Sequence, residues 1–452
     1  MFIYKNKTSL NTKKNSKSYF IKSEKLLGSI KVPGDKSISQ RALIISLICS
    51  GKTIIEDILD SEDVFHTMKA VILLGANIKI IDNKVEILGI GIGNLVSPKK
   101  PIYMGNSGTG VRLLLGLVAG SNALVTFYGD SSLSVRPMER LIKPLEQMGA
   151  KIVCSNNKLP ITIIGARAKG FVLPITYKLP VPSAQLKSAI LLAALSARGI
   201  TSIIESKESR NSTEQMLKKR GAAIKKERVN KDKRIITIEG TSFLRSRNIK
   251  IPGDPSSAVF LAVAALITKK SQISIENVLY DSFRLRVFYV LKKMGANIKI
   301  IRSNENNCKI VAKSSKLKNI FLTEKLSVSL IDEYPILSIA AACAEGKMTM
   351  QGLRELRYKE SDRFTAIIEG LKKSGVNANS DKDNIIIRGN KKIKGGFTLD
   401  AKYDHRIAMS FNILSLVTDK PIYIKGNESI YTSFPNFFND LKALGALSRI
   451  NE

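Results

Sequence analysis

A short phrase occurs six times in the chain. Its pattern is Leu-x-x-apolar-Gly-Ala-apolar or a close variant, and its glycines are Gly75, Gly149, Gly221, Gly295, Gly375 and Gly445. Successive glycines are 74, 72, 74, 80 and 70 residues apart. Six units of about 75 residues account for nearly the whole chain, so the sequence predicts a fold built from one repeated supersecondary unit.

Each repeated glycine is preceded by a second shared feature, a polar loop that leads into an apolar helix. These loops begin at Pro33, Gly105, Pro180, Pro252, Asp332 and Asp404. Each unit is predicted to run strand, loop, helix, strand, helix, Gly-Ala turn, strand. Strands and helices that alternate in this way predict an α/β fold.

The six units fall into two similar halves. Pro-Gly-Asp begins at both Pro33 and Pro252, which are 219 residues apart, and Gly75 and Gly295 are 220 residues apart. A chain of 452 residues exceeds what one hydrophobic core usually supports. The sequence therefore predicts two domains with three units each.

The composition is that of an ordinary soluble protein, with 44% hydrophobic residues. The longest apolar run, 258–268, is too short to cross a bilayer, and the start of the chain lacks the apolar stretch of a secretory signal. The four cysteines (Cys49, Cys154, Cys308 and Cys343) form no Cys-x-x-Cys pair. These features favour a reducing cytoplasm and argue against a zinc site.

The net charge of +34 is also a feature of nucleic-acid-binding proteins. The lysines are spread over every unit, however, and the aromatic residues are not interleaved with basic clusters. This distribution favours a solvated basic surface that attracts small anionic substrates, and leaves a nucleic-acid partner as the less favoured alternative.

Cations and hydroxyls gather where the predicted helices begin, as at Lys36, Ser37 and Arg41. A helix N-terminus presents unpaired N–H groups and partial positive charge to a ligand beyond it. These groups together predict a phosphate or carboxylate site, although an Asp35 cap with solvated cations explains this loop equally well. The further candidate cations are Arg136, Arg210, Arg363 and Arg406.

The second half of the chain supplies acid and base groups. Asp332 lies at a predicted helix start, Lys359–Arg363 contains two cations and two carboxylates, and Asp404 and His405 open the last long apolar helix. Caps and surface ion pairs account for any one of these. Their recurrence at equivalent places predicts an anionic substrate beside a carboxylate base, Asp332 or Glu360.

In order and spacing these stretches resemble the EPSP synthase (3-phosphoshikimate 1-carboxyvinyltransferase) family. The resemblance rests on GDKSISQR, GNSGTGVR, SAQLKSA, PGDPSSAVF, DEYPILSIAAA, KESDR, DHRIAMSF and TSFP, and it covers residues 24–450. SAQLKSA and DEYPILSIAA are most similar to the class II branch of that family.

The resemblance implies a two-domain inverted α/β barrel, the enolpyruvyl transferase fold, with three repeats in each domain and the active site in the cleft between them. Residues 1–32 would be a tail plus a first strand of the C-terminal domain, 33–251 the N-terminal domain, and 252–452 the C-terminal domain. We also expect no metal and no cofactor, a monomer in the cytoplasm, and no nucleic-acid or membrane partner.

The reaction that the resemblance implies transfers the enolpyruvyl group of phosphoenolpyruvate to the 5-hydroxyl of shikimate 3-phosphate and releases phosphate, on the route to chorismate and the aromatic amino acids. Asp332 would be the base and Glu360 the acid, with Lys36 assisting proton transfer. The residues implied for shikimate 3-phosphate are Lys36, Ser37, Arg41, Ser183, Ala184, Gln185, Arg210, Asp332 and Lys359. Those implied for phosphoenolpyruvate are Lys36, Gly108, Arg136, Gln185, Arg363 and Arg406.

Several positions depart from the family's pattern. Gln40 stands where histidine is usual, Asn211-Ser212 where Asp-His is common, and Asp281-Ser-Phe-Arg284 replaces Asn-Pro-Thr-Arg. Thr432-Ser433 stands where many members have a lysine that contacts phosphoenolpyruvate. Gly108 is the family's usual residue, whereas glyphosate-tolerant class II members often carry alanine there, so we expect glyphosate to inhibit this protein.

Two alternatives are kept. The related transferase that acts on UDP-N-acetylglucosamine has the same fold and donor, but its usual mobile-loop cysteine has no good counterpart, because Cys154 and Cys308 lie in strand-like segments. The other alternative is a basic nucleic-acid-binding protein, which predicts steeply salt-dependent affinity and no turnover.

Overall fold

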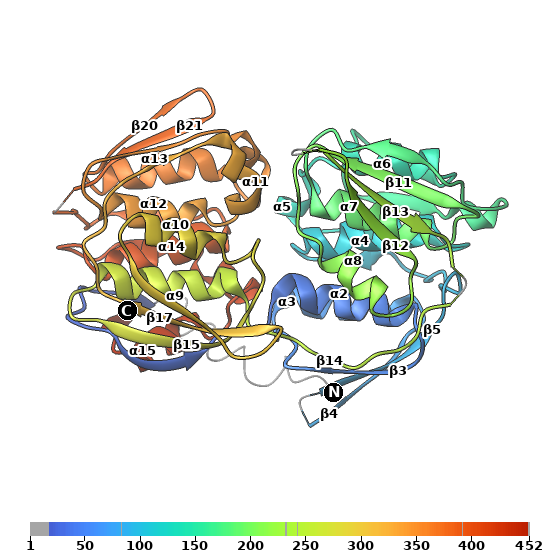
Figure 1. The fold of residues 1–452 in the computed structure, drawn as a ribbon, viewed down its shortest axis with the longest axis horizontal. Helices are drawn as coiled ribbons and strands as arrows, with labels where there is room; N and C mark the ends of the chain where they lie inside the picture. The colour runs from blue at the N-terminus through green and yellow to red at the C-terminus, as the bar shows by residue number, and fades with distance from the viewer. Residues whose placement is uncertain (1–17, 83, 231–232, 242, 391, 451–452) are drawn as a thin grey trace. The chain divides into compact units, whose positions relative to one another are not determined.

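The structure, a computed structural model, describes residues 18–450 apart from residues 83, 231–232, 242 and 391. The chain forms two compact units, whose elements Figure 1 labels. Unit 1 contains the described residues up to Asp35 and those from Pro252 onward, and unit 2 contains Lys36–Ile251. The chain passes between the units after Asp35 and after Ile251.

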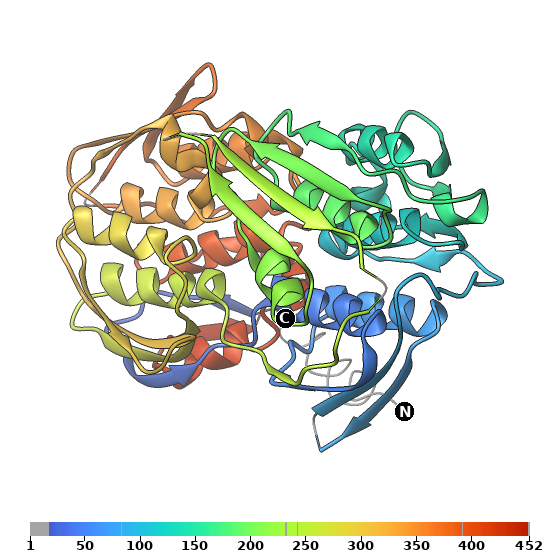
Figure 2. The same ribbon diagram turned by 45° about the vertical axis from the view of Figure 1, so that its right-hand side comes forward.

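Unit 2 contains three copies of one α/β arrangement. The first consists of α2 (Lys36–Leu47), β3 (Ser50–Glu56), α3 (Glu62–Leu73), β4 (Asn77–Ile81), β5 (Lys84–Ile90) and β14 (Ile249–Lys250). The second consists of β6 (Ile102–Tyr103), α4 (Gly108–Ala119), β7 (Leu124–Tyr128), α6 (Glu139–Gln147), β8 (Lys151–Cys154) and β9 (Ile161–Ile164). The third consists of β10 (Thr176–Lys178), α7 (Ala184–Ala194), β11 (Ile200–Glu205), α8 (Ser212–Lys218), β12 (Ile224–Arg228) and β13 (Arg234–Glu239). Figure 2 shows the strands of this third sheet, drawn in green, side by side.

Unit 1 repeats the arrangement. Its first copy consists of β2 (Leu27–Lys31), α9 (Pro255–Ile267), β15 (Gln272–Leu279), α10 (Arg286–Lys293), β16 (Asn297–Arg302) and β17 (Asn307–Lys313). The second consists of β18 (Phe321–Leu322), α12 (Tyr334–Ala342), β19 (Lys347–Met350), α13 (Arg363–Lys373), β20 (Asn377–Asp381) and β21 (Asn384–Arg388). The third consists of β22 (Thr398–Asp400), α14 (His405–Ser415), β23 (Tyr423–Lys425), α15 (Phe437–Ala443) and β24 (Ser448–Ile450), with β1 (Ser18–Phe20) beside β24.

Each copy contains one parallel strand pair, and in the first copy of each unit the parallel partner comes from far along the chain. Strand β14 pairs with β3, and β2 pairs with β15, so the first sheet of each unit is completed by a strand distant in sequence. The other neighbours in the four-stranded sheets are antiparallel. Shorter helical elements lie within these copies, between their longer helices and strands: α5 (Ser131–Ser134), α11 (Ser327–Leu330), η3 (Arg354–Tyr358) and η4 (Asn427–Thr432).

The repeated glycine ends a helix in every copy. All six glycines have positive φ, between +75° and +117°. After α3, Gly75 N–H donates to the carbonyl of Ile72 and Ala76 N–H to that of Val71, which is the Schellman pattern. A residue with a side chain is strained at this φ, and the apolar residues beside the glycine pack into the core. The period found in the sequence is therefore the period of one helix-ending turn.

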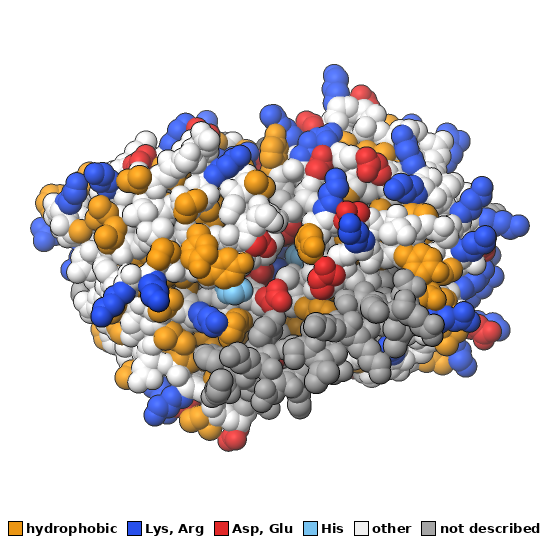
Figure 3. Space-filling view, turned by 180° about the vertical axis from the view of Figure 1, so that it is seen from behind, with side chains coloured by type: hydrophobic (Ala, Val, Ile, Leu, Met, Phe, Trp, Pro, Cys, Tyr) orange, Lys and Arg blue, Asp and Glu red, His pale blue; other side chains and the backbone are white. Residues whose placement is uncertain are grey.

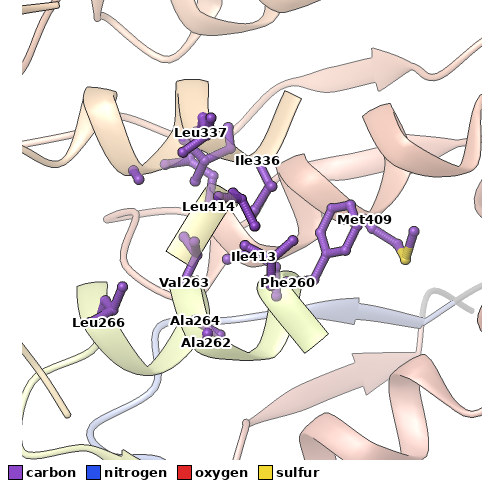
Figure 4. Close-up of a cluster of buried hydrophobic side chains, with 14 of the residues drawn as sticks. Phe260, Ala262, Val263, Ala264, Leu266, Ile336, Leu337, Met409, Ile413 and Leu414 are labelled. Atoms are coloured by element: carbon purple, nitrogen blue, oxygen red, sulfur yellow. The ribbon is translucent and has the colours of Figure 1, made fainter. Parts of the chain in front are cut away.

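The inner helices form the cores of the two units. In α9 every residue except Ile267 is buried, as expected for a helix that is apolar on all sides. Figure 4 shows Phe260 and Val263 of this helix close to Ile336 of α12 and Ile413 of α14. Small residues allow close approach in unit 2, because a Cβ on Gly116 of α4 would lie 2.3 Å from the Ala189 carbonyl oxygen of α7. Among the described residues, no helix is long and apolar enough to span a membrane.

A buried arginine holds the two Pro-Gly-Asp segments together on the unit 1 side. The Nη1 of Arg284 lies 2.6 Å from Asp35 Oδ2, and its Nη2 lies 2.7 Å from Asp254 Oδ1. Burial opposes the charge of this guanidinium, but Asp35, Asp254 and Glu333 outweigh that effect and raise the pKa of Arg284. The backbones also pair, since Asp35 N–H donates to Pro252 O and Asp254 N–H to Pro33 O.

The turn at Gly221 offers a test of why the phrase contains glycine. A Cβ at Gly221 would meet nothing within 4 Å, so an alanine there differs from glycine through backbone strain alone. We expect Gly221→Ala to lower the free energy of unfolding by about 1 kcal/mol. Gly221→Asn, which tolerates positive φ better, should lose less. Denaturant unfolding measures both, and equal stability of the alanine variant and the wild type would contradict the explanation.

Candidate functional site

In unit 1 the sequence-predicted residues converge on Arg363, the first residue of α13. Its guanidinium is buried, and its Nε lies 2.7 Å from Asp404 Oδ2. Its Nη2 lies 2.5 Å from Glu360 Oε2, and its Nη1 lies 3.6 Å from Asp332 Oδ1. Burial opposes the charged form, but the fields of Asp404, Glu360 and Asp332 outweigh burial and raise the pKa of Arg363. The side chain is therefore a fixed cation.

Asp404 connects Arg363 to the start of α14. As the N-cap residue of that helix, Asp404 accepts through Oδ1 from the N–H groups of Arg406 and Ile407. Its Oδ2 accepts from Arg363 and from Ser361 Oγ at 3.1 Å. One buried carboxylate thus orients an arginine side chain and caps a helix at the same time.

Asp332 and Arg406 complete this group, which we call the unit 1 cluster: Asp332, Lys359, Glu360, Arg363, Asp404 and Arg406. The Nζ of Lys359 lies 3.1 Å from Asp332 Oδ1, and Arg406 Nη1 donates to the Asp332 carbonyl at 2.7 Å. The side chains of Asp332 and Glu360 keep 22% and 20% of their surface exposed, so a ligand can reach both carboxylates. Residues 332, 359, 360, 363 and 406, all predicted from the sequence, are brought together here.

In unit 2, Lys36 is the first residue of α2, and its Nζ lies 3.0 Å from Asp63 Oδ2 on α3. Arg41, just over one turn further along α2, connects three helices. Its Nε donates to Thr213 Oγ1 on α8 at 2.8 Å, and its Nη2 to Ser188 Oγ on α7 at 3.3 Å. The sequence pointed to both cations but gave no sign of these partners.

The start of α4 lies against the start of α7. Arg112 Nη1 donates to Gln185 Oε1 at 3.0 Å and to the Gly108 carbonyl at 3.3 Å, while Gln185 Nε2 donates to Thr109 Oγ1. A Cβ on Gly108 would lie 2.9 Å from Nη1 of both Arg112 and Arg136. Glycine at position 108 therefore leaves room for two guanidinium groups.

Arg136 is held by neighbours in the segments before α4 and α6. It donates to Asn106 Oδ1 and, at 3.2 Å, to Ser132 Oγ. Asn106 in turn donates to Asp130 Oδ2 at 2.8 Å, and Asp130 caps α5. We call the predicted residues of this unit the unit 2 cluster: Lys36, Ser37, Arg41, Gly108, Arg136, Ser183, Ala184, Gln185 and Arg210. Ser183 caps α7, and Arg210 lies between β11 and α8, three residues before Thr213.

A buried group of three charged side chains, formed by one residue each of α7, β11 and α8, was not predicted from the sequence. The Nζ of Lys187 lies 3.1 Å from Glu205 Oε1 at the end of β11 and 2.7 Å from Glu214 Oε1 on α8. Lys187 is 1% exposed. A lysine in the middle of the apolar run of α7 was the available signal, because a lysine there needs a buried partner.

Comparison with known proteins places the chain in a family. The model for EPSP synthase (3-phosphoshikimate 1-carboxyvinyltransferase) matches residues 21–441. The chain belongs to the EPSP synthase family. It is 43% identical over 432 residues to the 3-phosphoshikimate 1-carboxyvinyltransferase of Chelativorans sp. (strain BNC1), covering 94% of this chain and 96% of that protein. It is 45% identical over 431 residues to that of Bartonella henselae, covering 94% and 97%.

A solved structure of EPSP synthase from Acinetobacter baumannii has a TM-score of 0.83 with this chain at 38% identity, covering 96% of this chain and 99% of that one. The family and the α/β enolpyruvyl transferase fold expected from the sequence are thereby confirmed.

On the face drawn in Figure 3, Lys and Arg side chains are dispersed and interspersed with acidic ones rather than gathered in one patch.

Thr432 stands at one of the positions where the sequence departs from the family's pattern. Thr432, at the end of η4, donates to the Ser429 carbonyl at 2.7 Å, and its Oγ1 lies 3.4 Å from His405 Nδ1. Thr432 therefore places a hydroxyl beside the first residue of α14, at the position where the resemblance implies a lysine.

The buried Lys187 group provides a stability test. Lys187→Met removes the cation and leaves two buried carboxylates uncompensated, so we expect a loss of about 3–5 kcal/mol in the free energy of unfolding. Lys226→Met is the matched control, because Lys226 Nζ lies 2.7 Å from Glu208 Oε1 in a partly exposed pair and should change stability by less than about 1 kcal/mol. Equal losses in denaturant unfolding would show that Lys187 is not a structural cation.

Proposed function

We propose that this chain catalyses the reaction of the EPSP synthase family, with the unit 1 and unit 2 clusters acting on the two substrates. The reaction transfers the enolpyruvyl group of phosphoenolpyruvate to the 5-hydroxyl of shikimate 3-phosphate and releases phosphate. It belongs to the shikimate pathway, which leads to chorismate and the aromatic amino acids. The observation that carries the proposal is the family match over residues 21–441.

Release of phosphate from phosphoenolpyruvate tests the function directly. We expect release with shikimate 3-phosphate present and none without it. UDP-N-acetylglucosamine is run as the alternative acceptor, because the related transferase uses that substrate with the same donor. Turnover with UDP-N-acetylglucosamine alone would overturn the assignment. A gel shift with duplex DNA and RNA at physiological salt tests the nucleic-acid alternative, and we expect no binding.

Shikimate 3-phosphate is assigned to Lys36, Ser37, Arg41, Ser183, Ala184, Gln185, Arg210, Asp332 and Lys359. Phosphoenolpyruvate is assigned to Lys36, Gly108, Arg136, Gln185, Arg363 and Arg406. The geometry supports these roles because six of the assigned cations are held by neighbouring groups, namely Lys36, Arg41, Arg136, Lys359, Arg363 and Arg406. Arg363 is an example: its Nε and Nη2 contact Asp404 and Glu360, and its buried Nη1, 3.6 Å from Asp332 Oδ1, makes no hydrogen bond within the described part of the chain.

Formation of the bond between the 5-hydroxyl oxygen and C2 needs two proton transfers, one to a base and one from an acid. As the 5-hydroxyl oxygen attacks C2 of phosphoenolpyruvate, Asp332 takes the hydroxyl proton and Glu360 donates a proton to the methylene carbon C3. Phosphate then leaves C2 while a proton leaves C3, which restores the double bond. We assign to the Lys36 ammonium the role of assisting proton transfer. Arginines and helix N-termini hold the charge that develops on the substrates.

The pairing of Glu360 with Arg363 suggests how the acid obtains its proton. In the structure Arg363 Nη2 donates to Glu360 Oε2, and this contact favours the carboxylate. An anionic substrate group that binds Arg363 competes for the same cation and adds negative charge beside Glu360. Both effects favour the protonated form that a general acid needs.

The finer assignments rest on sequence. We place the chain in the class II branch because of SAQLKSA and DEYPILSIAA, and the buried Lys187 group gives the lysine of SAQLKSA a structural role. We further propose a cytoplasmic monomer with domains 33–251 and 252–452, the strand before residue 33 belonging to the second domain. Light scattering after size exclusion tests the monomer, and a dimer mass would contradict it.

The two carboxylates can be tested separately. We expect Asp332→Ala and Glu360→Ala each to lower kcat by about two orders of magnitude or more, as for general acid–base groups, while substrate binding is largely kept. Glu369→Ala is the control, since this glutamate is exposed on α13, close in sequence to Glu360. Steady-state phosphate release measures all three variants. A kcat near the wild-type value for either test variant would remove that residue from its role.

Gly108 determines the expected response to glyphosate. Because a Cβ there would crowd Arg112 and Arg136, we expect Gly108→Ala to raise the KM for phosphoenolpyruvate and to weaken glyphosate inhibition. The wild type should be inhibited. Inhibition curves at fixed phosphoenolpyruvate concentration measure both proteins. Full wild-type activity at millimolar glyphosate, or an unchanged inhibition curve for Gly108→Ala, would contradict the expectation.

A further inference from the structure

Gln40 is a fully buried polar residue on α2, about one turn after Lys36. Its Nε2 lies 2.6 Å from Ser107 Oγ, 3.0 Å from Thr67 Oγ1 and 3.3 Å from the Asp63 carbonyl oxygen. The Asp63 carbonyl fixes the orientation of the amide, because the opposite orientation would bring two carbonyl oxygens together. One side chain thus joins α2 to α3 and to the residue that precedes α4.

Ser107 is the N-cap residue of α4, yet its side chain makes no capping hydrogen bond. A serine at this position normally accepts from an N–H group in the first turn of its helix. Here the Ser107 hydroxyl accepts from Gln40 and lies 3.3 Å from Thr67 Oγ1. The hydroxyl is occupied elsewhere, and it caps no N–H group at the start of α4.

The surroundings are shaped for this arrangement. A Cβ on Gly110 would lie 2.5 Å from Ser107 Oγ and 2.6 Å from Thr67 Oγ1, so only glycine leaves room for the two hydroxyls. Gly108, the first residue of α4, is assigned above to phosphoenolpyruvate. The first-turn N–H groups of a helix have no partner within the helix, so they suit an anion if no side chain caps them.

We propose that Gln40 is a positioning residue for phosphoenolpyruvate, which acts by holding the Ser107 hydroxyl away from the N-terminus of α4. Gly108 N–H donates to the Asn106 carbonyl, so the first-turn N–H groups that stay available to an anionic group of the substrate are those of Thr109 and Gly110. This inference rests on the proposed function, since it assumes that phosphoenolpyruvate binds at Gly108. Gln40 does not touch the substrate; it acts through Ser107. The amide is neutral at every physiological pH, so its hold on Ser107 does not depend on protonation.

Gln40→Leu tests the proposal, because leucine has a similar volume and no donor. With Gln40 replaced, Ser107 is free to cap α4 and competes with the substrate. We expect the KM for phosphoenolpyruvate to rise about fivefold to tenfold, the factor that corresponds to one serine cap, with the KM for shikimate 3-phosphate changed less than about twofold. Gln40→Asn, whose amide is too short to reach Ser107, should show the same rise and serves if the leucine variant does not fold.

The decisive measurement is rescue by a second change. Adding Ser107→Ala to either Gln40 variant removes the competing hydroxyl, so the KM for phosphoenolpyruvate should return to within about twofold of the wild type. A Gln40 that only supports the fold predicts the opposite, a double variant at least as impaired as the single one. That result, or an unchanged KM in the Gln40 variants, would overturn the inference.

Two comparisons make the outcome specific. Ser39→Ala is the matched control on α2, because its buried Oγ accepts from Leu59 N–H and has no contact with Ser107; its KM for phosphoenolpyruvate should stay at the wild-type value. Wild-type turnover is measured in the same assay. No wild-type turnover with shikimate 3-phosphate would reject the proposed function, whereas normal wild-type turnover without the expected shift in KM would reject only the role of Gln40.

Discussion

One buried arginine joins the two segments of unit 1 that adjoin the points where the chain passes to and from unit 2. Arg284 forms ion pairs with Asp35 and Asp254, the aspartates of the two Pro-Gly-Asp segments. The same guanidinium lies 3.2 Å from Ser256 Oγ, and that hydroxyl donates to Glu333 at 2.5 Å. A buried ion pair adds little net stability, because desolvation offsets most of its attraction. Arg284 therefore contributes mainly by fixing the positions of its neighbours. Through Ser256 this contact network extends to Glu333, the residue that follows Asp332.

The repeats could be predicted because each one ends a helix with a glycine that must adopt positive φ, and a conformational requirement of this kind is visible in the local sequence. Strand pairing could not be predicted in the same way. Strand β14 completes the sheet of β3, and β1 lies beside β24, although neither pair shares a local signal. Strands so distant in sequence pair because their pairing buries apolar side chains in a common hydrophobic core. Only the resemblance to a family suggested that the first strand joins the second half.

The same distinction applies to the site. Lys36, Arg363 and Arg406 were predicted to lie at helix starts, and each lies in the first turn of its helix, where a cation favours an anionic ligand. Their acidic partners were not all found, since Asp63 reads in the sequence as an ordinary first-turn acid of α3, and Glu205 and Glu214 as ordinary residues at the end of a strand and the start of a helix. A buried cation needs an acidic partner, but the sequence does not show which carboxylate lies next to it in the fold.

The charges of the two clusters suggest different parts in one reaction. The unit 2 cluster, as defined above, contains four cations (Lys36, Arg41, Arg136 and Arg210) and no carboxylate. Around the unit 1 cluster, three cations (Lys359, Arg363 and Arg406) accompany four carboxylates, Asp332, Glu333, Glu360 and Asp404. An excess of cations attracts anionic substrates. An excess of carboxylates favours uptake of a proton when a further anion binds, which is the condition for acid catalysis.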